Sequence, residues 1–127
     1  MAFINSVFTK LARHPKRIVF PEGTDERIVR AAGEYVQRKL GPAILIGKRN
    51  EIAEVARAIG VGLVRIHIID PAEAEDLDLF CTRLLRLPRY KDMAPDEARK
   101  MLLNPNYFGS MMLQGGQADA LVSGACT

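Results

Sequence analysis

The sequence predicts an α/β protein, a three-layer αβα sandwich built around a mainly parallel sheet. Short apolar segments alternate with longer segments in which apolar residues recur every three or four positions. Glycine, proline or an Asp-Pro pair separates most of these segments from one another. Strands that alternate with helices imply βαβ units, in which successive strands run parallel and helices cover both faces of the sheet.

Size and composition narrow the class of protein. The 127 residues suit one domain with a core of its own, and 48% hydrophobic and 26% charged residues with a net charge of +3 are ordinary values. The apolar runs are too short to cross a bilayer, and no basic stripe with interleaved aromatic residues is present. We therefore expect neither membrane nor nucleic-acid binding, and a small phosphorylated ligand fits the charge better.

Cysteine and histidine give no sign of a metal site. Cys81 and Cys126 lack the spacing of a metal or redox pair, which favours a reducing cytoplasm. His14 and His67 have no ligand partner at zinc spacing, so a surface His14 and a strand-borne His67 are expected. The first 17 residues lack the features of a secretory signal.

The N-terminal half contains three expected strands. A helix is expected at residues 2–14, a strand at 16–20, and then a helix that Thr24 caps and Gly41-Pro42 ends. A strand at residues 43–46 precedes a helix that Asn50 caps and Gly60 ends, and the third strand follows at 66–69.

The C-terminal half contains three helices and one strand. The first helix carries an apolar stripe from Leu77 to Leu85, and the second spans residues 95–103. Asn106 is expected to cap the third helix, where Gly109 permits close packing on a neighbour, and a strand at residues 120–122 follows.

Two strand ends are candidate binding sites. After the first strand, Gly23 lets the backbone turn, the next helix offers free N–H groups, and Arg27 can hold a phosphate or carboxylate. The alternative is that Arg27 pairs with Glu22 or Asp25 and braces the loop. After the last strand, Ser123 and Gly124 offer a hydroxyl and backbone amides to an anion, although an ordinary turn would look the same. We predict that both turns share one rim of the sheet and bind an anionic substrate.

Other nucleotide and hydrolase motifs are missing. Ser123 lacks the Gly-x-Ser-x-Gly elbow, and the chain has neither the dinucleotide glycine fingerprint nor a Walker-type loop. Arginines at positions 83, 86 and 89 form a basic cluster with Lys91. The cluster can neutralise phosphate groups, or it can simply be a solvated helix end.

Three stretches resemble the phosphate acetyl/butyryl transferase (phosphotransacetylase) family. They read RIVFPEGTDER at residues 17–27, NYFGSMM at 106–112 and GQADALVSGA at 116–125. Shorter matches occur at residues 43–47, 69–71 and 94–98. The resemblance covers nearly the whole chain and identifies it as an N-terminal portion of such an enzyme.

The resemblance implies an isocitrate/isopropylmalate dehydrogenase-like fold, present in part, and the exchange of acyl-CoA plus phosphate with acyl phosphate plus CoA. It implies a cytoplasmic homodimer without metal or cofactor, in which coenzyme A is a substrate. An aspartate base would activate the thiol, while arginines and a serine would hold the phosphate and the developing charge.

Residue by residue, the resemblance assigns substrate binding to Arg27, to Ser123 and Gly124, and to an arginine near Arg86 or Arg89. The aspartate base is expected beyond Thr127, so residues 1–127 are expected to form an N-terminal α/β domain without activity of its own. Phosphate butyryltransferase, and the non-catalytic acetyl-CoA sensor fused to some malic enzymes, are the alternatives. A nucleotide-binding Rossmann module is disfavoured by the missing glycine fingerprint.

Overall fold

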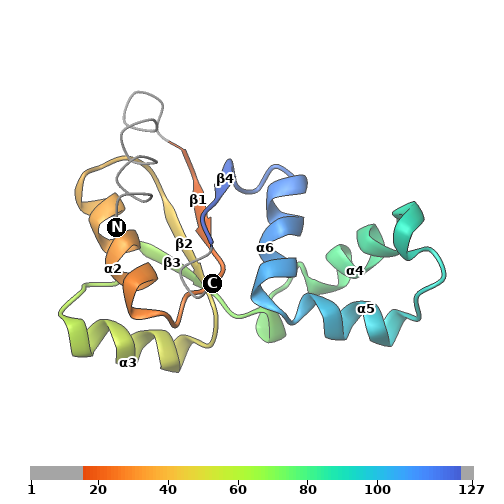
Figure 1. The fold of residues 1–127 in the computed structure, drawn as a ribbon, viewed down its shortest axis with the longest axis horizontal. Helices are drawn as coiled ribbons and strands as arrows, with labels where there is room; N and C mark the ends of the chain where they lie inside the picture. The colour runs from red at the N-terminus through yellow and green to blue at the C-terminus, as the bar shows by residue number, and fades with distance from the viewer. Residues whose placement is uncertain (1–15, 124–127) are drawn as a thin grey trace.

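A four-stranded parallel sheet forms the centre of the molecule (Figure 1). The computed structural model describes residues 16–123, so the helix predicted at residues 2–14 lies outside the described part. The strand order is β3-β2-β1-β4, and all three pairings are parallel. The strands are β1 (Ile18–Phe20), β2 (Ala43–Ile46), β3 (Ile66–Ile69) and β4 (Ala120–Leu121). The predicted fold class is confirmed.

Helices α2 (Glu26–Gln37) and α3 (Arg49–Ile59) cover one face of the sheet (Figure 1). Their apolar stripes pack on the strand residues that point to that face, such as Ile18, Phe20 and Leu45. Alternate residues of the same strands point the other way, because successive side chains of a strand lie on opposite faces. Helices lie on both sides of the sheet and bury both faces of β1 and β2. Neither strand therefore shows an apolar–polar alternation in its sequence.

Three helices lie on the opposite side of the sheet (Figure 1): α4 (Leu77–Arg86), α5 (Pro95–Leu102) and α6 (Pro105–Gln114). Short 3₁₀ turns, η1 (Pro71–Glu73) and η2 (Pro88–Tyr90), flank α4. Helix α6 lies beside the sheet, with α4 and α5 beyond it (Figure 1). A Cβ on Gly109 would lie only 3.2–3.3 Å from side-chain atoms of Leu121, Pro21 and Ile46. The predicted close packing at Gly109 is confirmed.

Three of the predicted helix caps are wrong. The side chain of Asp25, not Thr24, accepts the N–H of Arg27 at the start of α2. At α6, Pro105 takes the first helical position, where its missing N–H costs nothing, so the cap is Asn104 and not Asn106. Helix α3 begins directly after Lys48, and no side chain of the described residues caps it, so Asn50 already lies inside the helix.

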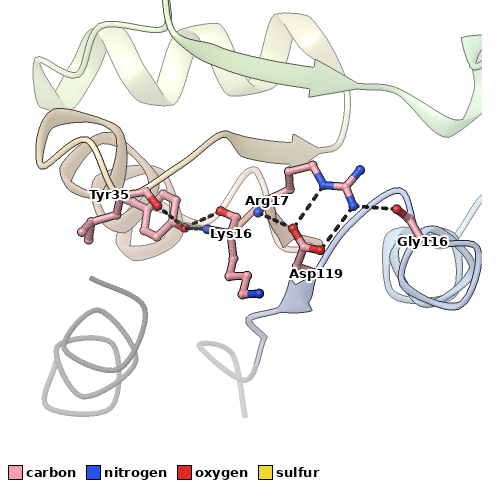
Figure 2. A network of polar contacts seen from close by, with 6 residues as sticks. Lys16, Arg17, Tyr35, Gly116 and Asp119 are labelled. Carbon is pink, nitrogen blue, oxygen red and sulfur yellow. Dashed lines mark hydrogen bonds and ion pairs between the residues drawn. The ribbon is translucent and has the colours of Figure 1, made fainter. Parts of the chain in front are cut away.

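A polar network joins β1 to its neighbours at the amino-terminal edge of the sheet (Figure 2). The backbone N–H of Arg17 donates to Asp119 at 2.8 Å, and its guanidinium donates to the same carboxylate at 3.1 and 3.2 Å and to the Gly116 carbonyl at 2.7 Å. The hydrogen bonds from Arg17 lower the pKa of Asp119 to about 2. Nearby, the Tyr35 hydroxyl bonds the carbonyls of Lys16 and Leu40.

Helix α6 runs antiparallel to the strands. It begins beside the carboxyl ends of the strands, where Asn106 contacts Ser123, and it ends near Gly116, which bonds Arg17 just before β1. The helix therefore spans the sheet from one edge to the other. One end of α6 therefore lies at the carboxyl edge of the sheet, beside Ser123, and the other lies at the amino edge, near Arg17.

Candidate active site at the carboxyl edge of the sheet

A cleft of about 720 Å³ opens at the carboxyl edge of the sheet. The residues after β1, β2 and β3 line it together with the corner between α5 and α6. Parallel strands end at the same edge, so three separate loops meet here. The volume lies in the range of small-molecule binding sites.

The cleft lies close to the point where the strand order changes direction. From β1 the chain proceeds to β2 and β3 on one side, and it then returns to place β4 on the other side of β1. In open α/β sheets, ligands bind outside the carboxyl ends of the strands at such a switch point. The predicted turns at residues 21–27 and at Ser123 follow the two strands that meet there.

The loop after β1 packs tightly against β2. The Gly23 N–H donates to the Ile46 carbonyl at 3.1 Å, and a Cβ on Gly23 would lie 2.5 Å from that oxygen. The next residues turn sharply, with the Asp25 N–H donating to the Glu22 carbonyl at 3.0 Å. This turn fixes the positions of Glu22 and Asp25 at the edge of the cleft.

Arg27 bonds Asp25. Its guanidinium reaches both carboxylate oxygens, at 3.2 and 3.1 Å, while 55% of its side chain is exposed. Of the two alternatives left open by the sequence, the structure shows the bracing contact, with Asp25 as a partner of Arg27. Arg27 does not line the cleft itself, but its partner Asp25 does.

Ser123 connects the two predicted turns directly. Its hydroxyl donates to Glu22 Oε1 at 2.6 Å, and its Oγ lies 3.2 Å from Asn106 Oδ1. The contact joins residues 101 positions apart in the sequence. The prediction that both turns lie on the same rim is confirmed by this contact. Gly124, the other predicted residue of that turn, lies outside the described residues.

The lining of the cleft is more acidic than the sequence analysis suggested. Its ionisable side chains are one lysine, Lys48, and four carboxylates: Glu22, Asp25, Glu51 and Asp70. Three helices direct their amino ends towards it, because Asp25, Lys48 and Asn104 all line the cleft and precede α2, α3 and α6. The helix dipoles and the carboxylates therefore act in opposite directions on a bound anion.

Arg86 and Arg89 lie elsewhere. Arg86 lines a second cavity of about 260 Å³ with Arg83, at the carboxyl end of α6 beside Gly115. Asn106 and Gln114 are about 12 Å apart along the helix axis, so this cavity is separate from the Ser123 contact. The guanidinium carbon of Arg89 lies 5.4 Å from the centre of the Tyr90 ring. The structure brings neither arginine into the cleft, and their role in ligand binding stays a prediction.

Arg83, a third arginine of the basic cluster, has a partly buried guanidinium. Its Nη1 is buried without a hydrogen-bond partner among residues 16–123, and its guanidinium carbon lies 5.8 Å from the centre of the Phe80 ring. Alanine at Gly115 would collide with that nitrogen, since the Cβ would lie 2.3 Å away.

Lys48, Asp70 and Asn106 were not predicted as residues of the site, and Glu22 was predicted only as part of the loop at residues 21–27 and a possible partner of Arg27. Lys48 and Asp70 follow the second and third strands, so the rule that parallel strands end at one edge would have found them. The contacts of Glu22 and Asn106 with Ser123, which no sequence pattern predicts, place these two residues in the site.

Comparison with known proteins decides the family. Residues 2–127 match the sequence profile described as phosphate acetyl/butaryl transferase. The chain belongs to this family. It is 40% identical over 122 residues to the phosphate acetyltransferase of Bacillus subtilis, and 34% identical over 120 residues to that of Nitratidesulfovibrio vulgaris.

Solved phosphotransacetylases have the same fold. The EutD phosphotransacetylase from Staphylococcus aureus matches with a TM-score of 0.84 at 30% identity, and a phosphotransacetylase from Streptococcus pyogenes with 0.85 at 33%. The chain spans 38% and 39% of those two chains, 37% of the Bacillus subtilis protein and 17% of the Nitratidesulfovibrio vulgaris protein. The resemblance seen in the three sequence stretches is confirmed.

Residues 16–123 contain neither a membrane-spanning helix nor a cluster of metal-ligating side chains. No helix there combines the length and the apolar character needed to cross a membrane. No group of three or more histidine, cysteine, aspartate or glutamate side chains in that part of the chain is arranged to hold a metal ion.

Proposed function

We propose that this chain forms one wall of the active site of a phosphate acetyltransferase, which exchanges acetyl-CoA and phosphate with acetyl phosphate and CoA. The observation that carries the proposal is the joining of the β1 and β4 turns by Glu22 and Ser123 at the mouth of a cleft. Membership of the family, and relatives named phosphate acetyltransferase, support it.

The cleft offers suitable chemistry for such substrates. Lys48 and the amino ends of three helices supply positive potential for phosphate groups, and exposed Arg27 adjoins the cleft through its ion pair with Asp25. In this reaction a thiolate attacks an acyl phosphate carbonyl, and fixed donors stabilise the resulting oxyanion.

A chimeric enzyme tests the proposal. Residues 1–127 replace the matching 37% of the Bacillus subtilis phosphate acetyltransferase, with which they share 40% identity. The release of free thiol from acetyl-CoA on addition of phosphate is then recorded. We expect turnover within about tenfold of the parent enzyme, and a loss of at least about tenfold in kcat/KM for Arg27→Ala, about 1.4 kcal/mol of transition-state stabilisation.

Arg30→Ala is the matched control. Arg30 lies on the same helix and pairs with Glu26 at 3.2 Å on the exposed surface, whereas Arg27 pairs with Asp25, a residue that lines the cleft. It should leave kcat/KM within twofold. A chimera that folds, as judged by circular dichroism, but transfers no acetyl group would refute the proposal. Faster turnover of butyryl-CoA than of acetyl-CoA would assign the chain to the butyryl enzymes.

We also propose that the protein acts in the cytoplasm as a homo-oligomer, in acetate metabolism, with coenzyme A as a substrate and no bound cofactor. The free thiol of Cys81 suits a reducing compartment. Several large apolar side chains on α4, α6 and the residue after α5 are at least 40% exposed, and an oligomer interface would cover such groups: Leu79, Leu103, Tyr107 and Leu113. Light scattering on the purified chain measures its mass in solution, and a monomer at micromolar concentration would contradict the oligomer.

A further inference from the structure

Glu22, Ser123 and Asn106 form a hydrogen-bonded row at the edge of the cleft, which we name the acceptor corner. Ser123 Oγ lies between the other two side chains, 2.6 Å from Glu22 Oε1 and 3.2 Å from Asn106 Oδ1. Glu22 and Asn106 line the cleft, and Ser123 is half-buried beside them. The three residues come from the loop after β1, the end of β4 and the first turn of α6.

The chemistry of these groups fixes the direction of the hydrogen bonds. A serine hydroxyl has one proton, and an ionised carboxylate only accepts. The distance of 2.6 Å is typical of a charge-assisted bond between a hydroxyl and a carboxylate, so the proton of Ser123 points at Glu22.

Asn106 must then donate to Ser123. Two acceptors would otherwise face each other at 3.2 Å, and the oxygen and nitrogen of an amide are exchanged by a simple flip of the group. The row therefore runs from the Asn106 amide through Ser123 to Glu22, each group donating to the next.

A ligand consequently meets Ser123 as an acceptor. The hydroxyl has two lone pairs, one of which faces Asn106, and its proton is held by Glu22. A phosphate oxygen is itself an acceptor, and the neighbouring carboxylate repels an anion. A neutral N–H or S–H group satisfies the remaining lone pair and avoids the repulsion.

We propose that the acceptor corner binds an uncharged hydrogen-bond donor, the amide N–H or thiol S–H of a pantetheine-type arm, and that the phosphate groups of the substrates bind elsewhere. The inference rests on the proposed function, because an acyl-CoA carries both kinds of group. It reverses the expectation that Ser123 holds an anion. Glu22 is then a positioning residue, which acts on the ligand through Ser123.

The test titrates the 127-residue chain with pantetheine and, separately, with inorganic phosphate, by calorimetry. Ser123→Ala should weaken pantetheine binding about 3- to 10-fold, the effect of one hydrogen bond between neutral groups, and leave phosphate binding within twofold. The matched control is Ser110→Ala on α6, whose hydroxyl donates to the Asn106 carbonyl at 2.8 Å and does not touch Ser123. It should change neither affinity.

A second variant tests the charge. Glu22→Gln removes the carboxylate and lets the new amide donate to Ser123, which frees the serine proton for an anion. Phosphate binding should then strengthen at least about threefold. Glu51→Gln removes another carboxylate of the cleft, one for which no contact with Ser123 is recorded among the described residues, and should have a smaller effect.

The proposal is overturned if Ser123→Ala weakens phosphate binding instead, if the unmodified chain shows no saturable binding of pantetheine, or if Glu22→Gln leaves phosphate binding unchanged. Circular dichroism verifies that each variant folds. If Ser123→Ala unfolds, the phosphate affinity of Glu22→Gln alone decides whether the proposal holds. If the chimera turns over acetyl-CoA but the chain does not bind pantetheine, only this inference is refuted and the proposed function stands. If the chain binds pantetheine through Ser123 but the chimera folds without activity, only the proposed function is refuted.

Discussion

Replacing Gly23 by alanine should destabilise the protein by about 1–3.5 kcal/mol. The new Cβ would lie 2.5 Å from the Ile46 carbonyl oxygen, whereas a carbon and a carbonyl oxygen in contact normally lie about 3.3 Å apart. The loop must therefore move away by about 0.8 Å. The oxygen belongs to the backbone at the end of β2, a central strand, so it cannot rotate out of the way.

The magnitude follows from three contributions. A shift of this size stretches the hydrogen bond from the Gly23 N–H to Ile46, now 3.1 Å, beyond its useful range, which costs about 1 kcal/mol. Overpacking adds roughly 1–3 kcal/mol. The reduced freedom of the unfolded chain offsets about 0.4–1 kcal/mol of this.

Urea unfolding followed by circular dichroism measures the change. Gly62→Ala is the matched control, because its backbone is outside the left-handed region and no described atom lies within 4 Å of the added Cβ. It should be neutral or stabilising by up to about 1 kcal/mol. If Gly23→Ala unfolds within about 0.5 kcal/mol of the unmodified chain, or if the control loses as much, the contact with β2 does not control this loop.

Three further substitutions have defined outcomes. Tyr35→Phe removes the buried hydroxyl that bonds the Leu40 carbonyl at 3.1 Å, and urea unfolding should show a loss of about 1–2 kcal/mol; no loss would mean that water replaces the bond. Because Arg17 lowers the pKa of Asp119 from 3.8 to about 2, the pair contributes stability that is fully present above pH 4 and lost as the pH falls to 2. Acid unfolding of Asp119→Asn should lack this component, and identical acid profiles would contradict the assignment. Gly109→Ala gains helix propensity but crowds three side chains, so thermal unfolding should show a net loss of about 1 kcal/mol, and a higher melting temperature would show that the neighbours yield freely.

The sequence was sufficient for the elements and their class. Strands buried on both faces and helices with one apolar stripe leave different periods in the sequence, and those periods depend only on local geometry. The boundaries of the strand at residues 43–46 and of the strand at 66–69 agree with the structure. The helix starts were less certain, since Thr24 and Asp25 are both capable caps and only the backbone angles of the folded chain select one.

The sequence also located the site at one edge of the sheet, because parallel strands must end together. Which side chains meet there was decided by the tertiary structure. Strand order placed β4 beside β1, and this brought Ser123 to Glu22 across 101 residues. The packing of the end of α4 beside the end of α6 placed Arg86 next to Gly115, away from Ser123, although its charge had suggested a place near the ligand.

Hydrogen-bond partners far apart in the sequence depend on strand order and helix direction, which leave no local pattern. Residue types and periods are local, so the chain by itself fixed its elements, its family resemblance and the edge that carries the site. The direction of the Ser123 proton and the separation of the cleft from the cavity at Arg86 were fixed only when the sheet and α6 came together.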